Sequence, residues 1–243
     1  MSDDPPHHAD IAFTAIPGVW VLSDFADAAV VHGFGDRTLT LEALADRLGY
    51  APATLVRLEQ VHGAEIAEIT TPPAEAGQVW TGMDGAVTDR RDVALTVRTA
   101  DCAAVGFYDP AHRAIGIAHV GWRGFAAELP RRMVEVMARR WNSQAAALRI
   151  ALGPMIGPCC YDVGPEFAAR FPAWVRQQAG RRVLDLRQGI IAQLQQAGIN
   201  PVHIADSQVC TACHVERFHS YRREGAAAGR CHLLLALTDR ITA

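Results

Sequence analysis

Residues 104–121 read AVGFYDPAHRAIGIAHVG, two apolar runs on either side of an Asp-Pro dipeptide. This pattern predicts an antiparallel β-hairpin, because a tight turn can join antiparallel strands whereas parallel strands need a long crossover. A hairpin of this length argues against a purely parallel sheet. The remaining segments mix strands and helices without regular alternation and contain no repeat or linker, so the sequence predicts one α+β domain with mixed sheets.

Apolar spacing and turn residues place the other elements. The strands are expected near 19–24, 29–34, 84–89, 93–102, 148–152, 202–205 and 231–237. The helices are expected at 40–49, 126–141, 165–178 and 185–197, and Pro130 fits the first turn of the second of these.

The overall composition fits a soluble globular protein that can bury a large core. Half of the 243 residues are apolar, 20% are charged, and the formal net charge is −3. Nothing in this balance favours nucleic acid or an anionic membrane, and no apolar stretch is long enough to span a bilayer. The first residues, MSDDPPHHAD, are acidic and lack the basic and apolar regions of a secretory signal. We therefore expect residues 1–12 to be a disordered tail, residues 13–243 to form a single domain, and the six cysteines to be reduced thiols.

Three apolar strands end in side chains that can bind a metal. His62 follows LEQV, Cys102 follows RTAD, and His119 follows IGIA. Strand ends lie at the rim of a sheet, where sites form on a rigid scaffold. Two imidazoles and one thiolate are a plausible zinc set, and three protein ligands leave an open position, as catalytic zinc sites do. Each residue taken singly also fits an ordinary polar or core role.

Other cysteines and loops are open to more than one interpretation. Cys210, Cys213 and His214 match a Cys-x-x-Cys-His haem-attachment pattern, but that attachment occurs outside the cytoplasm. A zinc knuckle needs a second pair, and Cys159–Cys160 lacks the usual spacing, so packing or incidental thiols are favoured. The segment GPMIGPCCYDVG could wall a pocket with Tyr161, and the arginines in FHSYRREGAAAGR could bind an anion.

Taken in order, LEQVHG, TADC, AHVGWRG, GPMIGPCCYDVG and FHSYRREGAAAGR resemble the laccase-domain family, also called the YfiH or YlmD type. Its members are named purine nucleoside phosphorylases, polyphenol oxidases or peptidoglycan-editing factors. The resemblance implies a layered α/β/β/α fold similar to the catalytic domain of a bacterial cytotoxic necrotising factor, and a cytoplasmic location. It also implies that zinc is bound by His62, Cys102 and His119, with copper as a possible substitute.

The implied activity is phosphorolysis of adenosine, inosine and methylthioadenosine, with adenosine deaminase activity beside it. The partners are then small molecules, a nucleoside and phosphate. Cys102, His119 and Arg123 are the expected catalytic residues, and Arg37 and Arg123 are the expected substrate-binding residues, holding phosphate. Zinc would lower the pKa of a water for deamination. Asp101 is expected to orient a neighbour, because strand alternation would turn it away from the substrate.

One departure from the family affects the N-terminal half. HGFGDR keeps the family's early block up to Arg37, but the double-glycine loop that usually follows is missing. If that loop encloses substrate in relatives, the pocket of this chain is more open or differently selective.

Three alternative functions remain. Cys102 could act as a nucleophile with a histidine base, as in an amidase that edits peptidoglycan precursors. His62, Cys102 and His119 could bind copper in a polyphenol oxidase, although no His-x-His pair supplies a trinuclear cluster. A metal-stabilised binding module would need a fourth protein ligand.

Overall fold

The predicted hairpin is confirmed and forms the centre of a sheet. Strand β9 (Ala103–Asp109) pairs antiparallel with β10 (Ala114–Val120), so that Val120 lies opposite Ala103 at one end of the hairpin. At the other end, the Asp109 carboxylate accepts hydrogen bonds from the backbone N–H groups of Ala111 and His112. The aspartate of the Asp-Pro dipeptide therefore holds the turn that its sequence predicts.

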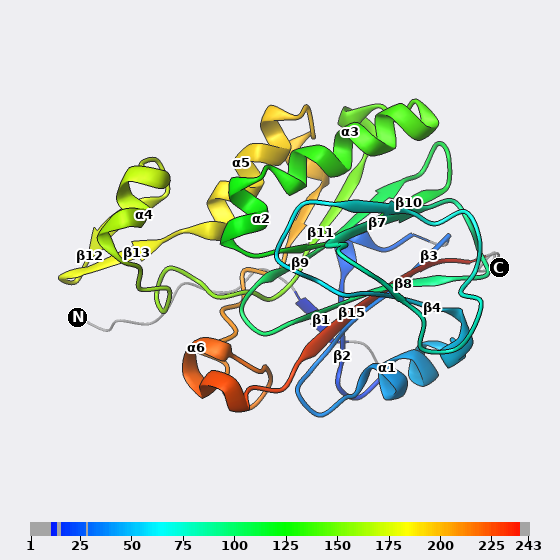
Figure 1. Ribbon diagram of the computed structural model, residues 1–243, viewed down its shortest axis with the longest axis horizontal. Coiled ribbons are helices and arrows are strands. Elements are labelled where there is room, and N and C mark those ends of the chain that lie inside the picture. The colour runs from blue at the N-terminus through cyan, green and yellow to red at the C-terminus, as the bar shows by residue number, and fades with distance from the viewer. Residues whose placement is uncertain (1–10, 14–15, 28, 239–243) are drawn as a thin grey trace.

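The computed structural model describes residues 11–13, 16–27 and 29–238, and within these residues it contains two large mixed sheets (Figure 1). The first has the spatial order β1 (Ile11–Phe13), β2 (Val19–Leu22), β3 (Val30–Gly35), β15 (Cys231–Leu237), β8 (Ala94–Thr99), β4 (Leu55–Leu58) and β6 (Val79–Trp80). The second has the order β14 (Ile204–Asp206), β11 (Arg149–Leu152), β9, β10, β7 (Gly85–Thr88) and β5 (Ile66–Glu68). Parallel pairs occur in both, at β4–β8 and β4–β6 in the first and at β11–β14 and β5–β7 in the second. The predicted α+β class with mixed sheets is confirmed.

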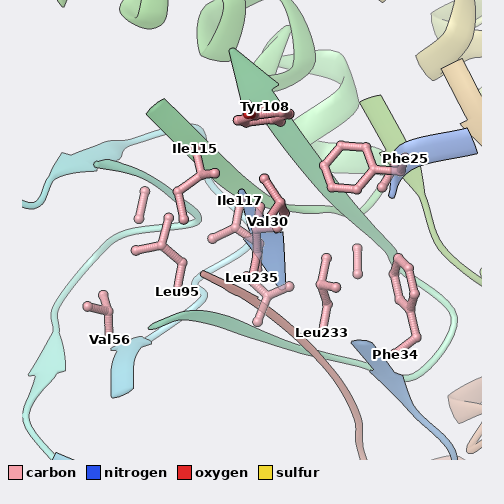
Figure 2. Packing of buried hydrophobic residues seen from close by; sticks show 14 of the residues in the cluster. Phe25, Val30, Phe34, Val56, Leu95, Tyr108, Ile115, Ile117, Leu233 and Leu235 are labelled. Atoms are coloured by element: carbon pink, nitrogen blue, oxygen red, sulfur yellow. The ribbon is translucent and has the colours of Figure 1, made fainter. Parts of the chain in front are cut away.

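The two sheets pack face to face over the main apolar core. Leu95 and Leu235 of the first sheet meet Ile115 and Ile117 of the second, and all four side chains are buried (Figure 2). A second apolar cluster lies between β9–β10 and the helices α3 (Leu129–Trp141) and α5 (Leu186–Gln196). A third seats α1 (Leu41–Leu48) on the outer face of the first sheet. Helices thus cover both outer faces of the paired sheets (Figure 1).

Two predicted helices differ from the structure. The helix expected at 126–141 is divided into α2 (Trp122–Ala126) and α3, because Glu128 between them has a left-handed backbone (φ 58°). Pro130 does occupy the first turn of α3. The helix expected at 165–178 ends early as α4 (Pro165–Arg170), and a small hairpin of β12 (Val175–Gln178) and β13 (Arg181–Leu184) follows. The short helix α6 (Tyr221–Glu224) precedes the last strand.

The N-terminal tail falls almost entirely outside the described residues. Residues 1–10 are not described, and Ile11 and Ala12 belong to β1. Among the described helices, none combines the length and the apolar character needed to cross a bilayer.

Candidate active site

The structure brings together the three side chains expected to bind a metal. One ligand atom from each of His62, Cys102 and His119 lies within 4.8 Å of the other two. The imidazoles of His62 and His119 meet edge to face, with ring centroids 4.8 Å apart. Their convergence supports the interpretation of the three residues as one site.

Strand register explains how residues so far apart in sequence meet. Cys102 directly precedes β9 and His119 is the penultimate residue of β10, and the two strands pair from Ala103 and Val120 inward. His62 lies in the loop after β4, in a left-handed conformation (φ 61°). The site therefore forms where the central hairpin of one sheet meets a loop from the other.

A buried carboxylate that the sequence analysis did not single out holds this arrangement. Asp84, immediately before β7, is fully buried and accepts hydrogen bonds from the backbone N–H groups of Val61 (3.1 Å), His62 (3.0 Å) and Gly63 (2.7 Å). It also accepts a hydrogen bond from His119 Nδ1 at 2.8 Å. One carboxylate thus shapes the loop that carries His62 and leaves Nε2 of His119 for the cluster, as carboxylates behind metal-ligating histidines do.

The ligand side chains perturb one another's protonation. Burial alone would raise the pKa of the Cys102 thiol, but hydrogen bonds with His119 and His62 lower it to about 6. Burial would likewise lower the pKa of His119, but its hydrogen bonds with Asp84 and Cys102 raise it to about 9. At neutral pH the site thus has a thiolate, which is the form of cysteine that binds metals.

Gly121 is required for space rather than for an unusual backbone angle. A Cβ at this position would lie 2.9 Å from the Cys102 sulfur and 3.2 Å from Cδ2 of His62. Its φ of −86° is open to any residue. The glycine after the His119 strand therefore lets the chain pass directly beneath the ligands.

A cavity of about 540 Å³ opens at the three ligands, within the size range of small-molecule sites. Trp122, Tyr161 and Tyr221 contribute aromatic surface to its lining, and arginines contribute positive charge. Burial raises the pKa of Tyr161 to about 12, so its phenol stays protonated. The arginines that line the cavity are Arg98, Arg123, Arg222 and Arg230.

The two arginines singled out from the sequence lie in different places. Arg123, in α2, lines the cavity, and its guanidinium lies 4.7 Å from the centroid of the Trp122 ring. Arg37 lines a neighbouring cavity, donates to the carbonyl of Val215 and pairs with Glu224 at 3.5 Å. The structure thus joins Arg123, but not Arg37, to the three candidate ligands.

Asp101 lies beyond the strand in which it was expected. β8 ends at Thr99, and Asp101 has a φ of 90°, so the argument from strand alternation does not apply to it. Its carboxylate accepts hydrogen bonds from the Thr211 hydroxyl (2.6 Å) and the Arg222 backbone N–H (2.7 Å). Asp101 therefore does orient neighbours, because the bend after β8 turns it toward the C-terminal segment.

A cluster of four thiols lies beside the cavity, where the sequence favoured packing or incidental thiols. The sulfur atoms of Cys159, Cys160, Cys210 and Cys213 all lie within 4.8 Å of one another. His214, the histidine of the haem-attachment pattern, is not part of this cluster. Two turns about 50 residues apart in sequence supply the two pairs, a proximity that Cys-x-x-Cys spacing does not encode.

Comparison with known proteins identifies related chains. A sequence profile of the family described as "Multi-copper polyphenol oxidoreductase laccase" matches residues 38–238. The purine nucleoside phosphorylase YlmD of Geobacillus stearothermophilus is 34% identical over 217 residues, covering 82% of this chain and 79% of the relative. A purine nucleoside phosphorylase of Deinococcus radiodurans is 36% identical over 203 residues, covering 81% of this chain and 76% of the relative. A protein named adenosine deaminase RL5, from an unknown prokaryotic organism, is 31% identical over 201 residues, covering 77% of this chain and 76% of the relative.

The fold is likewise shared with a solved structure. The crystal structure of YlmD from Geobacillus stearothermophilus aligns with a TM-score of 0.86 and 27% sequence identity, covering 95% of this chain and 100% of that one. The likeness therefore extends over nearly the whole of both chains.

Proposed function

The chain belongs to the laccase-domain family, and on that premise we propose that it is a zinc-dependent purine nucleoside phosphorylase with adenosine deaminase activity. Its expected substrates are adenosine, inosine and methylthioadenosine. The observation that carries the proposal is the cavity itself, in which arginines and aromatic rings surround the convergent ligands His62, Cys102 and His119.

The donor set fits zinc. Two imidazoles and a thiolate are zinc ligands in other proteins, and Asp84 holds His119 in the tautomer that leaves Nε2 to bind. Three protein ligands facing a cavity leave a position open toward substrate. Zinc bound there supplies a Lewis acid at the wall of the cavity. Copper would compete for the same ligands.

The cavity arginines suit the anionic co-substrate of phosphorolysis. In this reaction a phosphate oxygen forms a bond to the anomeric carbon of the ribose, and the purine leaves with the electrons of the glycosidic bond. Arg123, Arg98 and Arg230 can pair with phosphate and neutralise its charge as the bond forms. Among the described residues no carboxylate forms an ion pair with Arg123, so its guanidinium remains available to an anion.

The aromatic side chains suit the purine. Tyr161 lines the cavity, keeps its proton and can donate a hydrogen bond to the leaving base. Trp122 also lines the cavity, but its ring already contacts the guanidiniums of Arg123 and Arg170. Arg222 lies above the Tyr161 ring at 5.4 Å, and Asp101 fixes the backbone N–H of Arg222. The wall that would contact the base is therefore tied to the residue preceding Cys102.

The direct test measures products from metal-loaded protein. With phosphate present, we expect free base and ribose 1-phosphate from inosine, and without phosphate, we expect inosine from adenosine. His119→Ala should abolish both, whereas an inactive wild-type protein with full zinc content would contradict the proposal.

Two arginine variants test phosphate binding. Arg123→Ala should raise the KM for phosphate about tenfold, as expected for the loss of one charged hydrogen bond, and change the KM for inosine little. Arg131→Ala is the matched control, because Arg131 is exposed on α3 and pairs with Glu135 at 2.8 Å. Equal effects of the two variants would show that the cavity arginine has no specific role.

The low pKa of Cys102 also favours a second candidate, a cysteine-type amidase that edits peptidoglycan precursors. A nucleophilic thiolate should react with iodoacetamide in the protein as purified. A zinc-bound thiolate should be protected until a chelator removes the metal. Rapid alkylation without chelator, together with amide hydrolysis, would favour the amidase.

The other expectations from the sequence stay predictions. These are a single catalytic domain over residues 13–243, the likeness to the necrotising-factor catalytic domain, a cytoplasmic location, and phosphate binding by Arg37. Arg37 lies in the neighbouring cavity, which shares Gln60, Arg98 and Arg230 with the first. A bound substrate could reach it only by extending across these shared residues.

A further inference from the structure

Four cysteine thiols next to the candidate active site have the geometry of a closed metal site. The sulfur of Cys213 lies 3.5 Å from that of Cys159 and 3.5 Å from that of Cys160. With the sulfur of Cys210, all lie within 4.8 Å of one another. In a tetrahedral zinc site with zinc–sulfur bonds of about 2.3 Å, the sulfur atoms are about 3.8 Å apart. We propose that Cys159, Cys160, Cys210 and Cys213 bind a structural zinc ion, distinct from the metal of the active site.

The backbone around the thiols is shaped for such a site. Cys160 and Tyr161 both donate backbone hydrogen bonds to the carbonyl of Gly157, which closes one turn, and His214 donates to the carbonyl of Cys210, which closes the other. The Gly157 N–H donates to the Cys210 sulfur at 3.2 Å. Hydrogen bonds of this kind orient a thiolate and stabilise its charge.

Each turn also receives a guanidinium. Arg181 donates to the carbonyl of Cys159 at 3.1 Å, and Arg223 donates to the carbonyl of Ala212 at 2.9 Å. Zinc with four thiolates carries a net charge of about −2. Arg181 also pairs with Asp162 at 3.3 Å and Arg223 with Glu224, so the two guanidiniums hold the turns in place and offset only part of that charge.

The zinc would join a segment that lines the active-site cavity to a segment that contacts a lining residue, Asp101. Tyr161 follows directly on the Cys159–Cys160 pair and lines the cavity. Thr211, between Cys210 and Cys213, donates its hydroxyl hydrogen bond to Asp101, the neighbour of Cys102. A clamp at the thiols thus fixes the distance between the aromatic wall and the active-site ligands.

The same thiols could instead form a disulfide, since Cys213 lies equally close to Cys159 and Cys160. Four sulfur ligands could also bind iron. Zinc is favoured over a disulfide because all four sulfur atoms converge, where a disulfide needs only two. Both rivals are outcomes of the test below.

The test counts zinc atoms in the purified full-length protein. Wild-type protein should hold about two zinc ions per chain, and Cys213→Ser and His119→Ala should each hold about one. Cys231→Ser is the matched control, because Cys231 is buried, accepts a hydrogen bond from the His219 N–H and belongs to neither cluster, so this variant should keep two. Because His119→Ala empties only the active site, failure of the proposed enzymatic function would leave this result unaffected.

X-ray absorption at the zinc edge gives a second readout that works even if Cys213→Ser fails to fold. The mean number of sulfur ligands per zinc should be about 2.5 in wild type and about four in His119→Ala. A single zinc with about one sulfur ligand in wild type would overturn the proposal. So would iron in place of zinc, or a disulfide from Cys213 to Cys159 or Cys160 found by peptide mass mapping.

Discussion

Replacing Asp84 with asparagine tests whether one buried carboxylate organises the candidate metal site. Oδ1 of Asp84 accepts hydrogen bonds from the His62 N–H and His119 Nδ1, and Oδ2 accepts from the N–H groups of Val61 and Gly63. Asparagine keeps one acceptor oxygen and replaces the other with an amide that can only donate. Two of the four donors therefore lose their partner in either orientation of the amide.

The size of the effect follows from these contacts. A hydrogen bond to a charged group contributes about 1.5–3 kcal/mol, so the loss of two gives an upper range of about 3–6 kcal/mol. Val61 and His62 are exposed, so water can reach the freed N–H groups of the loop, and we expect about 3 kcal/mol of destabilisation. Loss of the partner behind a ligating histidine should also weaken zinc binding about 10- to 100-fold.

The assay pairs urea unfolding of metal-free protein with a zinc competition titration. Asp109→Asn is the matched control, because its buried carboxylate accepts hydrogen bonds from two loop N–H groups and from His112 Nδ1 at the opposite end of the same hairpin. Six strand residues, about 20 Å, lie between it and Cys102. Asp109→Asn should therefore lower stability but leave zinc affinity unchanged. If Asp84→Asn lost stability with unaltered zinc affinity, the orienting role assigned to Asp84 would be wrong.

Three further substitutions have defined outcomes. Gly121→Ala should reduce zinc affinity at least about tenfold, because its methyl group would press on the Cys102 sulfur and the His62 ring, and an unchanged competition titration would contradict this. Cys102→Ser should lose zinc at the active site while keeping the far-ultraviolet circular dichroism of the wild type, since serine keeps the shape but lacks a thiolate. Burial lowers the pKa of His32 from 6.5 to about 4, so the folded protein binds this proton more weakly than the unfolded chain does. The free energy of unfolding is therefore highest above pH 6.5 and falls as the pH drops toward 4. Urea titrations at pH 7 and pH 5 give the free energy of unfolding that is lost on acidification. This loss should be about 2 kcal/mol smaller in His32→Gln than in wild type.

Local patterns predicted those parts of the fold that local chemistry decides. The Asp-Pro hairpin formed as expected, and α1 ends at Gly49, whose φ of 83° is the left-handed cap that glycine favours. The prediction of a helix at 165–178 was wrong because a turn signal was missed. Ala179 and Gly180 both have positive φ, the conformation of a tight hairpin turn, and the flanking residues pair as strands.

Long-range pairing explains why the sites were only partly predictable. His62, Cys102 and His119 could be selected because each ends an apolar run, and because the family resemblance joined them. The Cys159–Cys160 and Cys210–Cys213 pairs carry no such common pattern. The parallel bridge between Met155 and Cys210 and the hydrogen bond from the Gly157 N–H to the Cys210 sulfur bring their turns together. For these two pairs, residue type identified possible ligands, but the contact between the turns depends on tertiary structure.

In both clusters, a buried aspartate that is not itself a candidate ligand fixes the loops that carry the ligands. Asp84 accepts hydrogen bonds from the backbone N–H groups of the His62 loop and from the His119 imidazole. Asp101 accepts from Thr211 and Arg222 through its side chain, and from the Ile156 N–H through its carbonyl, so it ties both thiol-bearing segments to Cys102. Loops make few regular backbone hydrogen bonds, and a carboxylate with several acceptor positions can satisfy their N–H groups instead. The positions of the ligands in this fold therefore depend as much on the two aspartates as on the strands that precede them.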